Sequence, residues 1–163
     1  MEWGTHMTKR SRDWVIIACA SLVIPFSCAG PDGMGVGESP NTFDRASAAL
    51  DRLADSYEKE NVSGFMSGVS GDYDLDYSDL GNRLRDEFDR FDALDLSIIV
   101  DRVSVDSSGT VAFADTHWIE RRVSGRTGRE GKVSGRTTFI FRIMPDGSLV
   151  LKGMKGDRVF GSP

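Results

Sequence analysis

The spacing of the apolar residues changes midway along this sequence, and this change constrains the fold. Up to Asp95 the apolar residues recur every three or four positions, as on one face of an amphipathic helix. After Asp95 they alternate with polar residues, which is typical of half-buried strands. Helices followed by strands, without alternation of the two, predict an α+β fold in which helices cover one face of a single sheet.

Three helical patterns precede Asp95, at residues 43–60, 62–69 and 80–91. Asn41 or Thr42 is expected to cap the first helix, and Ser78 the third. A short extra strand is expected at 73–77. Four longer strand patterns follow, at residues 96–105, 110–123, 132–144 and 148–159. Tight turns between them favour an antiparallel order. The prediction is three N-terminal helices on one face of a curved, mainly antiparallel sheet of four to six strands.

The N-terminal residues are typical of an export signal. Lys9, Arg10 and Arg12 precede an uncharged, mostly apolar run at 14–26, and this run is shorter than the roughly 20 residues that span a bilayer. Residues 1–27 are therefore predicted to be a signal peptide. Residues 28–42 are rich in Gly and Pro and are predicted to be a flexible tether. Residues 43–163 are predicted to be the folded domain.

The motif Ser27-Cys28-Ala29-Gly30 resembles the lipobox of bacterial lipoproteins. The resemblance implies that Cys28 carries a lipid, so that the protein is anchored in the cell envelope and faces the periplasm. Ser27 and Ala29 also fit an ordinary signal-peptidase site, with cleavage after Ala29. A secreted soluble protein is therefore the open alternative.

The charges are unevenly distributed. Lys and Arg number 20 against 25 Asp and Glu, which argues against a nucleic-acid partner. One Gly- and Ser-rich stretch is nevertheless basic, with Arg121, Arg122, Arg126, Arg129, Lys132 and Arg136. These six residues define the basic hairpin. It is expected to be exposed, and it suits an anionic lipid or polysaccharide, the acidic stretch at 72–106 of a second copy in a homodimer, or solvent alone.

The stretches at 53–66, 139–151 and 156–161 are similar to those of the nuclear transport factor two-like superfamily of cone-shaped α+β domains. The resemblance implies a helix layer packed on a curved sheet. It does not imply one activity, because this superfamily includes ketosteroid isomerases, dehydratases and proteins without known activity. The isomerases' acid and base positions correspond to Leu53, Ser78 and Thr138, and none of these can do that chemistry.

Two acidic or basic groupings are candidate sites. Asp115 and His117 lie two apart on a strand, so both point to one face and form a candidate acid/base pair. Asp72, Asp74 and Asp76 alternate in an oxygen-rich stretch, but the calcium loop pattern needs Gly at Tyr77 and Glu at Arg83. No metal and no cofactor is therefore predicted.

Aromatic and sulfur-containing residues supply enough apolar surface to line a cavity for a small molecule: Tyr57, Phe65, Met66, Tyr73, Phe88, Trp118, Phe139 and Phe141. The functional hypothesis is a non-catalytic, envelope-anchored binding or interaction domain that holds a small apolar molecule or a partner protein. The alternative is a small isomerase or hydro-lyase that uses Asp115 and His117.

Overall fold

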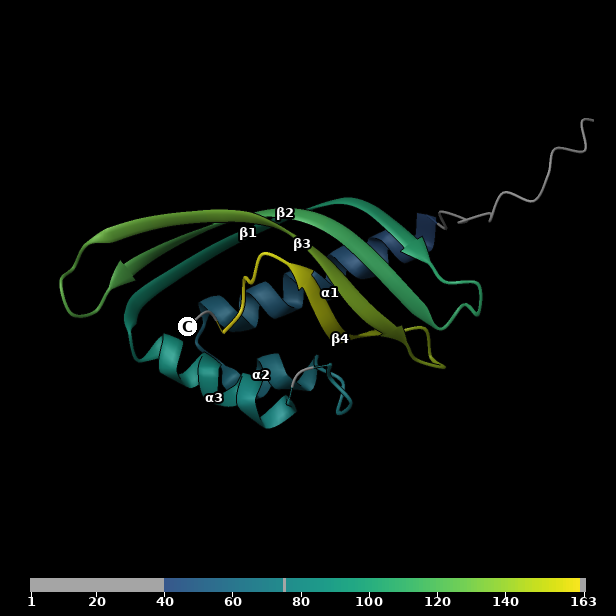
Figure 1. The fold of residues 1–163 in the computed structure, drawn as a ribbon, viewed down its shortest axis with the longest axis horizontal. Coiled ribbons are helices and arrows are strands. Elements are labelled where there is room, and N and C mark those ends of the chain that lie inside the picture. The colour runs from purple at the N-terminus through teal and green to yellow at the C-terminus, as the bar shows by residue number, and fades with distance from the viewer. Residues whose placement is uncertain (1–39, 75, 162–163) are drawn as a thin grey trace, which may run out of the picture. The chain divides into compact units, whose positions relative to one another are not determined.

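A computed structural model describes the chain at residues 40–74 and 76–161. Its elements are α1 (Pro40–Glu58), α2 (Val62–Ser67), α3 (Tyr77–Phe88), β1 (Phe91–Val105), β2 (Val111–Ser124), β3 (Glu130–Ile143) and β4 (Leu149–Gly156). The strands form one antiparallel sheet in the order β1-β2-β3-β4. The sheet is curved, and the helices lie on its concave side (Figure 1). The predicted α+β fold is confirmed.

The predicted signal peptide, Cys28 and most of the predicted tether lie outside the described residues. Within the described ranges, no helix combines the length and the apolar character needed to cross a membrane.

Helix α1 packs on the sheet through the face that its apolar spacing predicts. Ala46, Leu50, Leu53 and Tyr57 are buried, whereas Phe43, one turn before them, is 39% exposed. The helix begins at Pro40, three residues before the expected start. Proline suits the first turn of a helix because the missing N–H would have no partner there.

The loop before α3 differs from two expectations. The N-cap of α3 is Asp76 and not Ser78, because Asp76 Oδ1 accepts hydrogen bonds from the N–H groups of Ser78 (2.8 Å) and Asp79 (3.4 Å). The extra strand expected at 73–77 is wrong as well. Since Tyr77 already begins the helix, this segment only runs beside β4, where the Asp74 N–H donates to the carbonyl of Lys152 (2.8 Å).

Two strand boundaries also differ. Strand β1 begins at Phe91 and not at 96, because Phe91 already pairs with Ser124 of β2. Strand β4 ends at Gly156 and not at 159, since this glycine has a φ of 101° and turns the chain away from the sheet. The following residues 157–161, here called the C-terminal segment, pass into the core, where Val159 and Phe160 are fully buried.

Gly135 on β3 allows a close approach inside the core. The buried Trp118 side chain crosses over it and donates its Nε1–H to Thr137 Oγ1 (2.9 Å). A Cβ atom at Gly135 would lie 2.6 Å from Trp118 Cζ2 and 2.7 Å from Asp157 Cβ. Any side chain at this position therefore displaces Trp118 or the start of the C-terminal segment.

We expect Gly135→Ala to lower the free energy of unfolding by about 1–3 kcal/mol, the usual cost of overpacking a core. Chemical denaturation measures this change. Gly131→Ala on the same strand is the matched control, because its Cβ would meet nothing closer than Arg122 Cγ at 3.6 Å. Equal stability losses in the two variants would contradict this account.

Candidate functional site

Asp115 and His117 lie on the outer face of the sheet. Asp115 accepts hydrogen bonds from Arg102 Nη2 (2.7 Å) and Thr138 Oγ1 (2.8 Å), and His117 Nδ1 pairs with Asp101 Oδ1 (2.8 Å). Their side chains are 37% and 43% exposed. The intervening and flanking residues of β2 face the core, because side chains alternate along a strand.

An enzyme that uses this pair would need both side chains to face a hydrophobic hollow, and they lie on the outer face instead. The hydrogen bonds from Arg102 and Thr138 also lower the pKa of Asp115, so its carboxylate stays ionised. Each of the two side chains is held by neighbours on the outer face, Asp115 by Arg102 and Thr138 and His117 by Asp101.

The three aspartates of the oxygen-rich stretch are each engaged elsewhere. Asp72 accepts hydrogen bonds from Ser70 and Arg142, Asp74 pairs with Lys152 (3.8 Å), and Asp76 caps α3. Within the described part of the chain, no group of three His, Cys, Asp or Glu residues is placed to hold a metal ion.

The predicted apolar pocket residues form much of the core. Two of them, Met66 and Phe88, are half-buried. The other six are buried: Tyr57, Phe65, Tyr73, Trp118, Phe139 and Phe141. Phe160 from the C-terminal segment fills the space between them. Its ring centroid lies 4.7 Å from that of Phe65, 5.3 Å from that of Tyr57 and 6.0 Å from that of Phe139. Tyr73 borders a cavity of about 10 Å³, which is room for one water molecule.

Glu87 and Glu120 were not among the predicted site residues, yet they are the most unusual polar groups of the interior. Glu87 on α3 is fully buried and Glu120 on β2 is 2% exposed. Tyr57 of α1 lies next to both, and its hydroxyl donates to Glu120 Oε1 (3.1 Å). Three elements thus bring two carboxyl groups and a phenol together. We call Tyr57, Glu87 and Glu120 the buried carboxyl cluster.

Burial dominates the acid–base properties of this cluster. Burial and, to a lesser extent, the nearby charge of Glu120 raise the pKa of Glu87 to about 7, against the opposing effect of a hydrogen bond from the Gly161 N–H. Burial likewise raises the pKa of Glu120 and, most strongly, that of Tyr57. Such a cluster can hold and transfer a proton near neutral pH.

The sequence carried a signal for both glutamates. Glu120 continues the inward series of β2, two residues after Trp118. Glu87 lies three residues after Leu84, on the apolar face of α3. Each glutamate thus occupies a position that its own periodicity predicts to face the core. An acidic residue there indicates a buried titratable group, because core positions are rarely charged.

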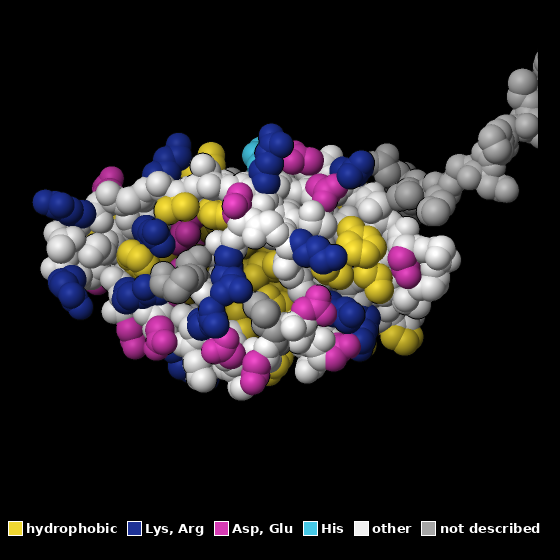
Figure 2. Space-filling view, viewed as in Figure 1, with side chains coloured by type: hydrophobic (Ala, Val, Ile, Leu, Met, Phe, Trp, Pro, Cys, Tyr) yellow, Lys and Arg dark blue, Asp and Glu magenta, His cyan; other side chains and the backbone are white. Residues whose placement is uncertain are grey.

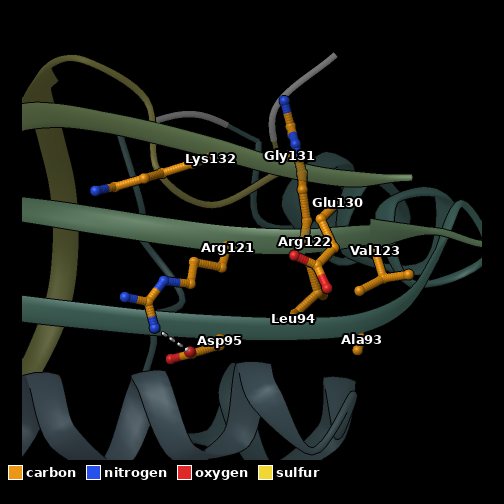
Figure 3. A pocket seen from close by; sticks show the side chains of 9 residues that line it. All are labelled: Ala93, Leu94, Asp95, Arg121, Arg122, Val123, Glu130, Gly131 and Lys132. Carbon is orange, nitrogen blue, oxygen red and sulfur yellow. Dashed lines mark hydrogen bonds and ion pairs between the residues drawn. The ribbon is translucent and has the colours of Figure 1, made fainter. Parts of the chain in front are cut away.

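The basic hairpin borders a cavity with a volume of about 510 Å³. Its lining comes from adjoining parts of β1, β2 and β3: Ala93, Leu94, Asp95, Arg121, Arg122, Val123, Glu130, Gly131 and Lys132. Figure 3 shows Asp95, Arg121 and Lys132 along one side of the cavity, with Val123 and Glu130 on the other. This arrangement follows the strand register, which pairs Asp95 with Arg121 and Arg121 with Lys132.

The cavity offers cations beside apolar surface. Arg121 reaches Asp95 only at 3.4 Å, and both side chains are more than 60% exposed, so this pair leaves the arginine available. The Arg122 guanidinium lies 4.8 Å from the centroid of the Phe91 ring. Figure 2 shows Lys and Arg side chains gathered at the end of the domain where Figure 1 places the β2–β3 turn.

Many solved structures are similar to this chain, and three of them illustrate the likeness. A nuclear transport factor 2-like superfamily protein from Salmonella enterica aligns with a TM-score of 0.60 at 13% identity, over 73% of this chain and 92% of its own. A conserved protein from Planctomyces limnophilus aligns with a TM-score of 0.63 at 12% identity, over 73% of this chain and 100% of its own. A ketosteroid isomerase-like protein from Erwinia carotovora aligns with a TM-score of 0.58 at 15% identity, over 72% of this chain and 94% of its own.

The domain has the nuclear transport factor 2-like fold. The superfamily resemblance inferred from the sequence is thus confirmed at the level of fold. No protein-family model and no curated protein matches the chain. Because these identities are low, the likeness establishes the architecture of this nuclear transport factor 2-like domain and not its activity.

We expect the free energy of unfolding to fall as the pH rises from about 5 to about 8. Between its ordinary pKa of 4.5 and its folded pKa of about 7, Glu87 binds a proton in the folded chain but not in the unfolded chain. The stabilisation is complete below the lower value and is lost as the pH rises through the upper one, a change of roughly 3 kcal/mol.

Chemical denaturation at several pH values measures this slope, and Glu87→Gln should remove most of it. Exposed carboxyls such as Asp106 and Asp146 have lowered pKa values, so their contribution is lost only in more acidic solution and does not mask the effect. Wild-type stability that is flat or increasing over this range would contradict the expectation.

Proposed function

We propose that this protein is a non-catalytic binding domain, held at the cell envelope by a lipid on Cys28, that takes an anionic ligand with an apolar part. The cavity at the basic hairpin is the proposed site. The observation that carries this proposal is the contrast between an interior filled by Phe160 and an open cavity of about 510 Å³ beside Arg121 and Lys132.

The chemistry of the lining supports an anion. The lining includes three cations, Arg121, Arg122 and Lys132, and two acids, Asp95 and Glu130. Ala93 and Val123 add apolar surface. Arginine and lysine hold carboxylate, sulfate or phosphate groups through charge-assisted hydrogen bonds. An apolar part of the ligand would gain from contact with the side chains between them.

A second cavity of about 460 Å³ is less suited to this role. It lies between α1, α2 and the start of β4, and its charged side chains are Arg52 and Asp55. Asp55 is paired with Lys59 (2.6 Å). The lining therefore has no excess of either charge, although Ala49, Leu53, Leu149 and Val150 give it apolar surface.

Binding of anilinonaphthalene sulfonate, an anion with an apolar ring system, tests the site by fluorescence titration. We expect the double variant Arg121→Ala/Lys132→Ala to raise the Kd about tenfold, since two exposed charge contacts of roughly 0.7 kcal/mol each give that factor. The affinity should also fall with added salt.

Lys59→Ala/Lys155→Ala is the matched control, because it removes two exposed lysines away from the cavity. It should leave the Kd unchanged, and near-ultraviolet circular dichroism should show that both variants fold. An equal loss of binding in the two double variants, or no loss in either, would refute the hairpin site.

The anchor is tested by mass spectrometry of the membrane fraction from cells that express the full chain. We expect a mature N-terminus at Cys28 that carries the added mass of acyl chains, and Cys28→Ser should abolish both the added mass and the membrane association. An unlipidated N-terminus at Gly30 would instead establish secretion, and it would leave the hairpin site untouched.

One observation favours acid–base catalysis as a second candidate function. Glu87, Glu120 and Tyr57 form a protonatable cluster within a fold that the ketosteroid isomerase-like protein from Erwinia carotovora shares. This candidate replaces the pair Asp115 and His117 as the source of the chemistry. It requires Phe160 to leave the interior, so that a substrate could reach the cluster.

A further inference from the structure

The buried carboxyl cluster places two acids where water is excluded. Glu87 and Glu120 approach Tyr57 from different elements, and their side chains are almost completely removed from solvent. Two ionised carboxylates in such a place would repel each other and lose their hydration, at a cost of several kcal/mol. The closed structure is therefore compatible with at most one of the two charges.

The C-terminal segment covers this cluster and is bound to it. Phe160 packs against the ring of Tyr57, and the N–H of Gly161 donates to Glu87 Oε2 (2.9 Å). The start of the segment is held separately, because the N–H of Arg136 donates to Asp157 Oδ2 (2.9 Å). Residues 158–161 can therefore move about a fixed point while the sheet stays intact.

One carboxyl oxygen of the cluster has no hydrogen-bond partner in the described part of the chain. The Tyr57 hydroxyl has a single hydrogen, which it donates to Glu120, and Glu87 Oε2 accepts the N–H of Gly161. Glu87 Oε1 is buried and has no hydrogen-bond partner among the described residues. A proton on this oxygen neutralises the side chain and leaves Oε2 free to bind Gly161.

We propose that the cluster of Tyr57, Glu87 and Glu120 is a proton-binding site that holds one proton in the closed structure, and that loss of this proton opens residues 158–161. Opening admits water to the two carboxylates and exposes the interior behind Phe160. This goes beyond the proposed binding function, because it concerns a different site and a change of conformation.

The surrounding charges do not replace the missing proton. Arg90, which follows α3, and Arg122 on β2 favour the ionised forms of Glu87 and Glu120 respectively, but burial outweighs both. Arg158 of the segment acts on Tyr73. Glu58 of α1 accepts the N–H of Leu96 (2.8 Å). Desolvation of the cluster therefore remains the dominant effect.

Water has a short route to the cluster once the segment moves. The cavity of about 10 Å³ is lined by Phe160 and Gly161 as well as by Tyr73 and Leu80. This space lies between part of the segment and α3 and has room for one water molecule. Displacement of Gly161 would join this space to Glu87, since the Gly161 N–H contacts that carboxyl directly.

Hydrogen exchange followed by mass spectrometry tests the proposal on the full chain between about pH 6 and about pH 8. After correction for the intrinsic pH dependence of exchange, we expect the protection of amides 158–161 in the wild type to fall about tenfold over this range. Opening becomes tenfold more favourable for each pH unit between the ordinary pKa of the Glu87 carboxyl and its higher pKa in the closed structure, and it levels off above the latter.

Glu87→Gln should keep the segment protected at every pH, because the amide carbonyl can accept from Gly161 while the group stays uncharged. Glu120→Gln should also increase the protection of the segment at high pH. It replaces Glu87→Gln in the test if that variant fails to fold. Asp86→Asn is the matched control. It removes an exposed acid one residue away on α3 and should keep the wild-type pH dependence.

Three results would overturn the proposal. One is wild-type protection of amides 158–161 that does not change with pH. Another is the wild-type pH dependence in both glutamine variants. The third is a parallel loss of protection in β2 and β3, which would show global unfolding in place of local opening. None of these bears on binding at the hairpin cavity, so the two proposals fail separately.

Discussion

Along β2, successive side chains point alternately toward the helices and toward solvent, because a strand repeats every two residues. This alternation buries Trp118 and Glu120 and leaves Asp115 and His117 on the outer face. The central strand thereby decides which polar groups share the dry interior and which are held in ion pairs outside it. The possible sites of chemistry in this domain depend on that division.

The interior is closed by the chain's own C-terminal segment. Phe160 contacts the rings of Tyr57, Phe65 and Phe139, and this packing completes the core beneath the sheet. The same segment seals two carboxyl groups away from water, which is favourable only while a proton or another positive charge offsets their repulsion. Packing and proton binding are thus coupled at Glu87, where the Gly161 N–H is bound.

The cavity at the basic hairpin is open to solvent, in contrast to the closed interior. The strands extend beyond the helices at the end of the sheet where the β2–β3 turn lies (Figure 1). Arg121 and Lys132 border a cavity whose lining comes from β1, β2 and β3. Cations there remain hydrated and available to an anionic partner, whereas the acids of the interior have lost their hydration. A domain built this way separates a surface suited to binding from an interior that responds to protons.

Local periodicity determined much of the fold. The apolar spacing of α1 and the alternation of β2 and β3 are set by which side chains can share one face, so the α+β architecture and the basic hairpin were predictable. The inward positions of Glu87 and Glu120 were also implicit in those patterns. The boundaries were less predictable, since Phe91 extends β1 only through its pairing with Ser124.

Only the tertiary structure determined which residues fill the interior between the curved sheet and the helices. The sequence pattern predicts a last strand that continues to 159, but Gly156 turns the chain out of the sheet and into the core, where Phe160 meets aromatic rings from three other elements. The meeting of Glu87 with Glu120 likewise joins residues distant in sequence, and no local pattern encodes that distance. The sequence by itself determined which faces are apolar, and the tertiary packing determined which charged groups those faces enclose, because burial of a charge depends on every element around it.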